Sequence, residues 1–192
     1  MLKDRQVYYK IILSVVPLTA VCSTALSSLI AAVISLITVA SVWVLLPLLG
    51  RFLTEKTAPF VRIIIALGVI GTLTLISTVL FKDATQSIAL YLPLIALTTV
   101  MLHPINENTK ALPLYALKLG ATLGGFGSAF LFLVGVLKEL LGMGSLFGLD
   151  IYTKLFAPIE FFKTPGGALL ICAALTIAYN LAVKYLGKRG AI

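Results

Sequence analysis

Stretches without a charged side chain make up most of this chain, and their lengths predict its helices. They cover residues 11–50, 63–81, 84–106, 119–137 and 164–183. A helix needs about 20 apolar residues to cross the hydrocarbon core of a bilayer. The first stretch is about twice that length, so we expect it to hold two helices with a turn near Ser27 and Ser28.

The pattern as a whole predicts six membrane-spanning helices. Their expected bounds are 12–28, 30–50, 61–81, 88–104, 113–138 and 165–185. The remaining segments are short loops, of which 139–164 is the longest, and they offer no room for a folded nucleotide-binding or protease domain. We therefore expect an all-α integral membrane protein in which residues 1–192 form a single domain.

The composition supports a membrane location and excludes other classes. Hydrophobic residues make up 60% of the chain and charged residues 11%, against roughly 45–50% and 25% in ordinary globular proteins. A soluble fold of this size could not cover so much apolar surface, and disordered chains are poor in apolar residues. Two cysteines and one histidine are too few for a disulfide scaffold or a four-ligand zinc site.

Basic residues in the short loops predict the orientation of the helices. With six spans, the side that holds both termini carries Lys3, Arg5, Lys10, Arg51, Lys56, Arg62, Lys110, Lys118, Lys184, Lys188 and Arg189. The opposite side carries Lys82, Lys138, Lys154 and Lys163. Both termini are therefore expected in the cytoplasm, and the net charge of +8 reflects topology and contact with the lipid bilayer rather than a nucleic-acid surface. The first apolar stretch is too long for a cleaved signal, whose core spans about 7–15 residues.

Two proline segments resemble one another. Val16–Ser23 reads VPLTAVCS and Leu92–Thr99 reads LPLIALTT, at an offset of three predicted spans. An odd number of crossings turns the second copy over, so we expect an inverted 3+3 repeat with halves at about 12–81 and 88–185. A proline inside a helix removes a hydrogen bond, and broken helices in a membrane are tolerated only beside protein or a water-filled cavity.

We therefore expect helices 1 and 4 to be broken and to meet at a site. The candidate residues of this broken-helix site are Pro17, Thr19, Ser23, Pro93, Thr98 and Thr99. The alternative is that both prolines are simple kinks and that the similarity arose by chance.

The fifth predicted span carries two further kinds of candidate. Gly120, Gly124 and Gly127 fall close to one helical face, where small residues allow helices to pack closely. Glu139 ends the span beside Lys138, and an acid in that place either lies on an ion path or serves local pairing or capping. His103, next to Pro104, is expected to be a histidine at the membrane surface rather than a haem ligand or proton relay.

Four segments give the chain a family resemblance. They are the two proline segments, the stretch KELLGMGSLFG at 138–148 and the stretch PGGA at 165–168. In this order they resemble the small six-helix subunits of the Rnf and Nqr respiratory complexes, and the resemblance is nearest to the subunits called E in Rnf and D in Nqr. It implies a multi-pass subunit of a bacterial or archaeal cell membrane, within a complex that couples electron transfer to Na⁺ or H⁺ translocation.

The resemblance also implies a partner and a cofactor. In that family two six-helix subunits, inverted relative to each other, each contribute two cysteines to a [2Fe–2S] cluster. Here the two cysteine positions are occupied by Val16 and Thr99, which supply no thiolate. Cys22 and Cys172 lie elsewhere and are expected to be small core residues. We therefore expect a subunit without its own cluster ligands, acting as a scaffold or as half of an ion or electron path, with no catalytic residue of its own.

A second hypothesis is a small secondary transporter that uses the inverted repeat without redox chemistry. The hydroxyls of Thr19, Ser23, Thr98 and Thr99 would then coordinate Na⁺ or a polar solute between the broken helices.

Overall fold

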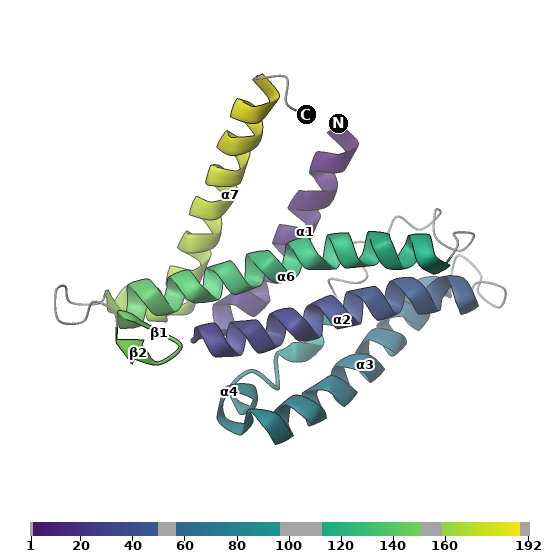
Figure 1. Ribbon diagram of the computed structural model, residues 1–192, viewed down its shortest axis with the longest axis horizontal. Coiled ribbons are helices and arrows are strands. Elements are labelled where there is room, and N and C mark those ends of the chain that lie inside the picture. The colour runs from purple at the N-terminus through teal and green to yellow at the C-terminus, as the bar shows by residue number, and fades with distance from the viewer. Residues whose placement is uncertain (1, 50–56, 97–112, 151–158, 189–192) are drawn as a thin grey trace.

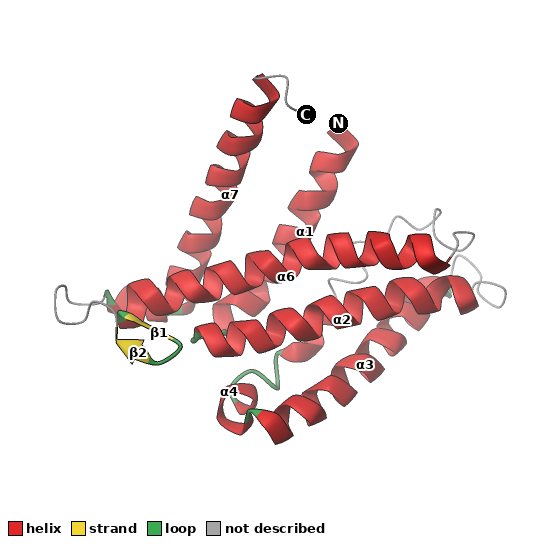
Figure 2. Cartoon of the chain, viewed as in Figure 1, coloured by secondary structure: helices red, strands yellow, loops and turns green. Residues whose placement is uncertain are grey.

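The computed structural model describes residues 2–49, 57–96, 113–150 and 159–188, which form a mostly helical fold (Figures 1 and 2). The longer helices are α1 (Leu2–Val21), α2 (Ala25–Leu49), α3 (Ala58–Leu80), α6 (Pro113–Met143) and α7 (Pro165–Lys188). The shorter elements are helix α4 (Lys82–Gln86), the 3₁₀ helices η1 (Leu92–Leu94) and η2 (Glu160–Lys163), and strands β1 (Ser145–Leu146) and β2 (Leu149–Asp150). The two strands pair as an antiparallel hairpin directly after α6.

Four of the described helices are long and apolar enough to cross a membrane. They contain Ala25–Leu49, Pro59–Leu80, Leu114–Met143 and Pro165–Tyr185, and they correspond to the second, third, fifth and sixth predicted spans. In α1 the apolar part is the shorter Lys10–Val21. The described part of the chain therefore supports a multi-pass membrane protein, although it shows fewer continuous spans than the six predicted.

The turn between the first two helices lies at residues 22–24, so the prediction of a turn near Ser27 and Ser28 is wrong. Both serines are buried in the first turn of α2. Thr24 caps this helix, because its Oγ1 accepts a hydrogen bond from Ser27 N at 3.2 Å while Ser27 Oγ accepts one from Thr24 N at 3.2 Å. This reciprocal arrangement is a capping box, which satisfies two backbone N–H groups at once and so fixes the start of the helix.

Pro17 does not break the first helix. It lies inside α1, which continues to Val21, and its ring is exposed on the helix surface. A proline lacks the N–H that would bond one turn back, but on an outer face the helix can accommodate it as a local distortion. The break comes after Val21, beyond the expected position.

The fourth predicted span is not a continuous helix over its described part. Residues 87–91 form turns, and η1 follows with Pro93 inside it. The backbone bonds here join residues three apart, such as Tyr91 N to Ile88 O at 2.9 Å and Leu94 N to Tyr91 O at 2.9 Å. Such bonds produce tight 3₁₀ turns instead of an α-helix. The rest of this predicted span, 97–104, lies outside the described residues.

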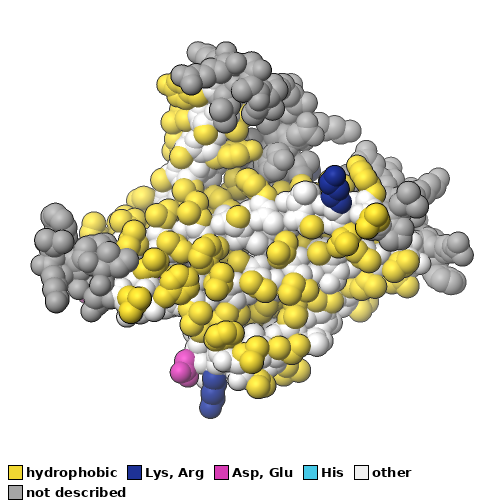
Figure 3. All heavy atoms as spheres, viewed as in Figure 1, with side chains coloured by type: hydrophobic (Ala, Val, Ile, Leu, Met, Phe, Trp, Pro, Cys, Tyr) yellow, Lys and Arg dark blue, Asp and Glu magenta, His cyan; other side chains and the backbone are white. Residues whose placement is uncertain are grey.

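An antiparallel pair formed by α2 and α6 is the centre of the fold (Figure 1). Helix α3 packs against α2, while α1 and α7 both contact α6 and extend from it toward the same side (Figure 1). Only 11% of the most apolar part of α3 is buried. The outer surface is accordingly rich in hydrophobic side chains (Figure 3), as expected where helices face lipid.

Candidate functional site

Two consecutive charged residues near the end of α6, Lys138 and Glu139, are buried at the break between α1 and α2. Only 1% of Lys138 and 2% of Glu139 is exposed. Charged side chains are almost never fully buried unless they have partners. Lys138 and Glu139 have different bonding partners. Successive residues of a helix point about 100° apart, so the two side chains reach different helix ends.

Lys138 bonds to the end of α1. Its Nζ donates a hydrogen bond to the Ala20 carbonyl oxygen at 2.9 Å. The last four carbonyls of a helix have no donor within the helix, and the helix dipole places partial negative charge there. A buried ammonium at this point therefore pairs with a helix terminus instead of with a carboxylate.

Glu139 bonds to the start of α2 and to the hairpin. Its Oε2 accepts a hydrogen bond from Ala25 N, the first residue of α2. Its Oε1 accepts one from Gly148 N at 3.1 Å and a longer one from Ser145 Oγ at 3.4 Å. The N-terminus of a helix carries partial positive charge, so a carboxylate stabilises it. The two residues thus hold both sides of the helix break, each with the sign of charge that its helix end favours, and we call them the Lys138–Glu139 clamp.

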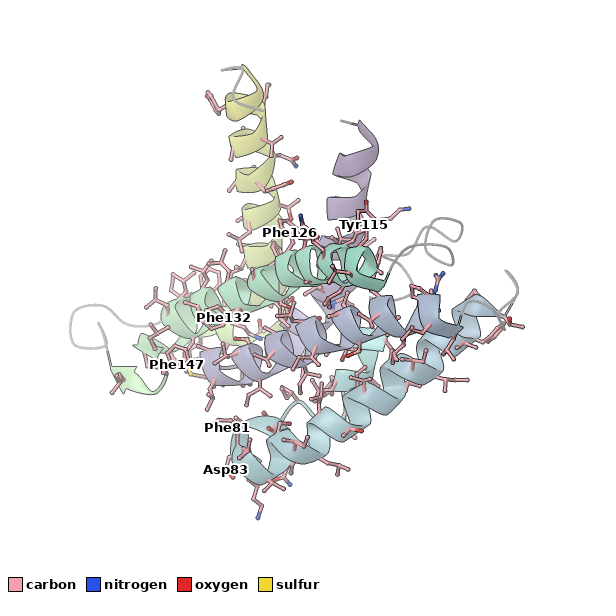
Figure 4. All side chains as sticks on the ribbon, turned by 45° about the vertical axis from the view of Figure 1, so that its right-hand side comes forward. Phe81, Asp83, Tyr115, Phe126, Phe132 and Phe147 are labelled. Atoms are coloured by element: carbon pink, nitrogen blue, oxygen red, sulfur yellow. The ribbon has the colours of Figure 1, made fainter. Side chains whose placement is uncertain are left out.

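The hairpin that covers Glu139 is shaped by glycines. Gly144 ends α6 with a positive φ of 71°, and its N–H donates to Leu140 O at 3.0 Å, as is common at helix C-termini. Gly148, with a φ of 79°, turns the chain back so that its N–H faces the carboxylate. Phe147 also has a positive φ, and the centre of its ring lies 6.4 Å from the centre of the Phe132 ring on α6 (Figure 4).

Two cysteines and a threonine lie beside the clamp. Thr19 Oγ1 donates to Val16 O at 2.7 Å and lies 3.3 Å from Cys172 Sγ on α7. Cys22 and Cys172 belong to the same buried cluster, and the Lys138 ammonium lies close enough to both thiols to interact with them electrostatically. The sequence offered no reason to place residues 22, 138 and 172 together, because they are far apart along the chain.

The other candidates of the broken-helix site are only partly brought together. Helix α1 contacts η1, and Leu18 and Leu92 belong to one buried cluster. Pro93, like Pro17, is exposed, and Ser23 is half-buried in the connection between α1 and α2. Thr98 and Thr99 lie outside the described residues, as does His103.

The glycines predicted for helix packing lie against neighbouring helices. A Cβ built on Gly120 would come within 2.6 Å of Trp43 Cβ, and one on Gly124 within 3.1 Å of Val39 Cβ, both on α2. One on Gly127 would come within 3.0 Å of Ile11 Cγ2 on α1. The tightest approach is at Gly135, where any Cβ would overlap the Ser28 side chain. Helix α6 therefore lies too close to α2, and at Gly127 too close to α1, for larger residues at these points.

Two of the cations that the orientation prediction assigns to loops are buried in helices. Lys138 is one, and Arg62 on α3, which is 1% exposed, is the other. Within the described segments, the Nε and Nη2 groups of Arg62 have no hydrogen-bond partner. Arg62 belongs to the side of the termini and Lys138 to the opposite side of the predicted topology. Removing both from the comparison therefore still leaves more basic residues on the side of the termini.

Of the two positions where the family resemblance would place a cysteine ligand for a [2Fe–2S] cluster, one is described and the other, Thr99, lies outside the described residues. Val16, at one of the family's cysteine positions, is half-buried in α1 and has no atom that can bind iron. Across the described ranges, no group of three or more His, Cys, Asp or Glu side chains is arranged to hold a metal ion.

The apolar helices and their lipid-facing surface define an integral membrane protein with charged residues buried at a helix break. A family model described as Rnf-Nqr subunit, membrane protein, matches residues 2–181, and the chain belongs to this Rnf-Nqr family. Among curated proteins, none matches the chain.

Proposed function

We propose that the chain is a membrane subunit of an Rnf/Nqr-type ion-translocating electron-transport complex and provides no ligand to a [2Fe–2S] cluster. The family match over residues 2–181 carries this proposal. The buried clamp supports it, because ionisable groups inside a membrane protein are costly and usually mark a path or a switch. The chain then acts as a scaffold or as one half of an ion or electron path.

The partner proposed here is a second six-helix subunit of the same family, inverted relative to this one. The two halves of the chain would be related in the same inverted way, with α2 and α6 as equivalent helices. The antiparallel α2–α6 pair and the exposed apolar faces of α3 and α7 support this arrangement, since outward apolar surface is available for another membrane subunit as well as for lipid.

The cluster part of the proposal is tested by low-temperature EPR of the purified protein, alone and with its co-purified partner subunits. We expect no [2Fe–2S] signal that depends on this chain, because Val16 offers no sulfur where the family has a cysteine. A signal that disappears in Cys22→Ser or Cys172→Ser would overturn this part of the proposal.

The assembly part is tested by gentle solubilisation of native membranes and identification of the proteins that elute with this chain. We expect another six-helix subunit of the family together with flavin-bearing or ferredoxin-like subunits. Purification of the chain alone, with solute uptake in liposomes that hold only this protein, would instead support the transporter hypothesis.

A further inference from the structure

The two cysteines beside the clamp form a pair that neither the family nor the sequence pattern assigns. We propose that Cys22 and Cys172 are a redox-closing dithiol, which a disulfide-class oxidant converts into a bond between the end of α1 and α7. The proposal does not depend on the proposed function, because it is argued from the packing and the predicted orientation of this chain's own helices.

The geometry brings the two cysteines into one buried cluster where α1 packs against α7. Cys22 N donates to Leu18 O at 3.2 Å, so Cys22 still continues the helical path of α1. Residues three apart on a helix share a face, with Cβ atoms about 5–6 Å apart, so Cys22 lies on the same face as Thr19. That face meets Cys172, whose Sγ is 3.3 Å from Thr19 Oγ1.

Burial in the closed structure disfavours the thiolate form of both cysteines, and the nearby Lys138 ammonium offsets only part of this effect. A thiolate, not a thiol, attacks a disulfide, and a nearby cation stabilises it. The Lys138 ammonium acts on both thiols, and it is held in place by its bond to Ala20 O at 2.9 Å. On the predicted orientation the end of α1 and the start of α7 also face away from the cytoplasm, toward the compartment in which disulfides form and persist.

The reaction is two successive exchanges. Cys172 Sγ attacks one sulfur of the oxidant and displaces the other, which leaves with the proton of Cys172 as a thiol. Cys22 Sγ then attacks Cys172 Sγ and displaces the second thiol in the same way, so that the pair loses two electrons and two protons to the oxidant. Cys22 is 0% and Cys172 4% exposed, so a bulky oxidant acts during assembly, before α7 closes over α1.

The test uses native membranes that hold the full chain, before and after treatment with iodine, which is small and apolar enough to reach buried thiols. Iodine takes two electrons from the two thiols and leaves as two iodide ions with two protons. Remaining thiols are then alkylated in detergent, and the proteolytic peptides are identified by mass spectrometry. We expect a reducible peptide pair that joins Cys22 to Cys172.

A matched control moves one thiol by a single residue. Cys22→Ser combined with Ser23→Cys keeps two thiols but turns one of them by about 100°, and it is expected to give at least about tenfold less linked peptide, because disulfides require specific geometry. Equal linkage in both proteins, or no linked pair in the unaltered chain before or after iodine, would overturn the proposal. Size-exclusion chromatography of both proteins confirms that the control folds.

Discussion

Replacement of Glu139 by glutamine tests the clamp with the smallest possible change. The carboxylate accepts hydrogen bonds through both oxygens: Oε2 from Ala25 N, and Oε1 from Gly148 N and Ser145 Oγ. Glutamine has one oxygen and one NH₂ group, and the latter can only donate. In either orientation of the amide, a buried backbone N–H therefore faces another donor.

The expected cost follows from these contacts. A buried N–H left unpaired costs about 1–3 kcal/mol, and loss of the negative charge at the α2 N-terminus adds about 0.3–1 kcal/mol, or more where the site is buried. Together they predict a loss of about 1.3–4 kcal/mol in the free energy of unfolding. With roughly 2–4 °C per kcal/mol for a chain of this length, the Tm should fall by about 8 °C at the middle of these ranges.

The measurement is the Tm of the purified protein in detergent, followed by size-exclusion chromatography of heated samples. Glu160→Gln is the matched control, because it makes the same chemical change at an exposed carboxylate in η2. A drop for Glu139→Gln no larger than that of Glu160→Gln, below about 2 °C, would show that Glu139 does not hold the start of α2 and would refute the clamp.

Two further changes are measured by the same assay. Lys138→Met removes the donor to Ala20 O and should destabilise by about 1.5–3 kcal/mol, and an unchanged Tm would contradict a stabilising bond to the end of α1. Gly135→Ala would force a methyl group onto Ser28 and should cost about 1–3 kcal/mol or more. Gly125→Ala, where nothing lies within 4 Å of the added carbon, should leave the Tm unchanged or raise it slightly, and equal effects of the two substitutions would argue against close α2–α6 packing.

The hydrophobic pattern was enough to predict the second, third, fifth and sixth spans, because the free energy of placing a helix in a bilayer depends on a local run of about 20 apolar side chains. The boundary between α1 and α2 was predicted in the wrong place although a local signal was present. Thr24 and Ser27 have the spacing of a capping box, and their reciprocal bonds start α2 at Ala25. The fourth span shows the opposite case, since its apolar run is broken into turns within the described residues.

The sequence by itself therefore determined the membrane class, most of the helices and the resemblance to a family that the match over residues 2–181 confirms. Tertiary structure alone decided what the charged pair does and which residues surround it. Glu139 meets Ala25 across 114 positions of the chain, and Thr19 meets Cys172 across 153. No local periodicity encodes such distances, because they depend on how α1, α6 and α7 pack at the helix break, where a buried charge is stable only if the fold brings a helix end of opposite polarity to it.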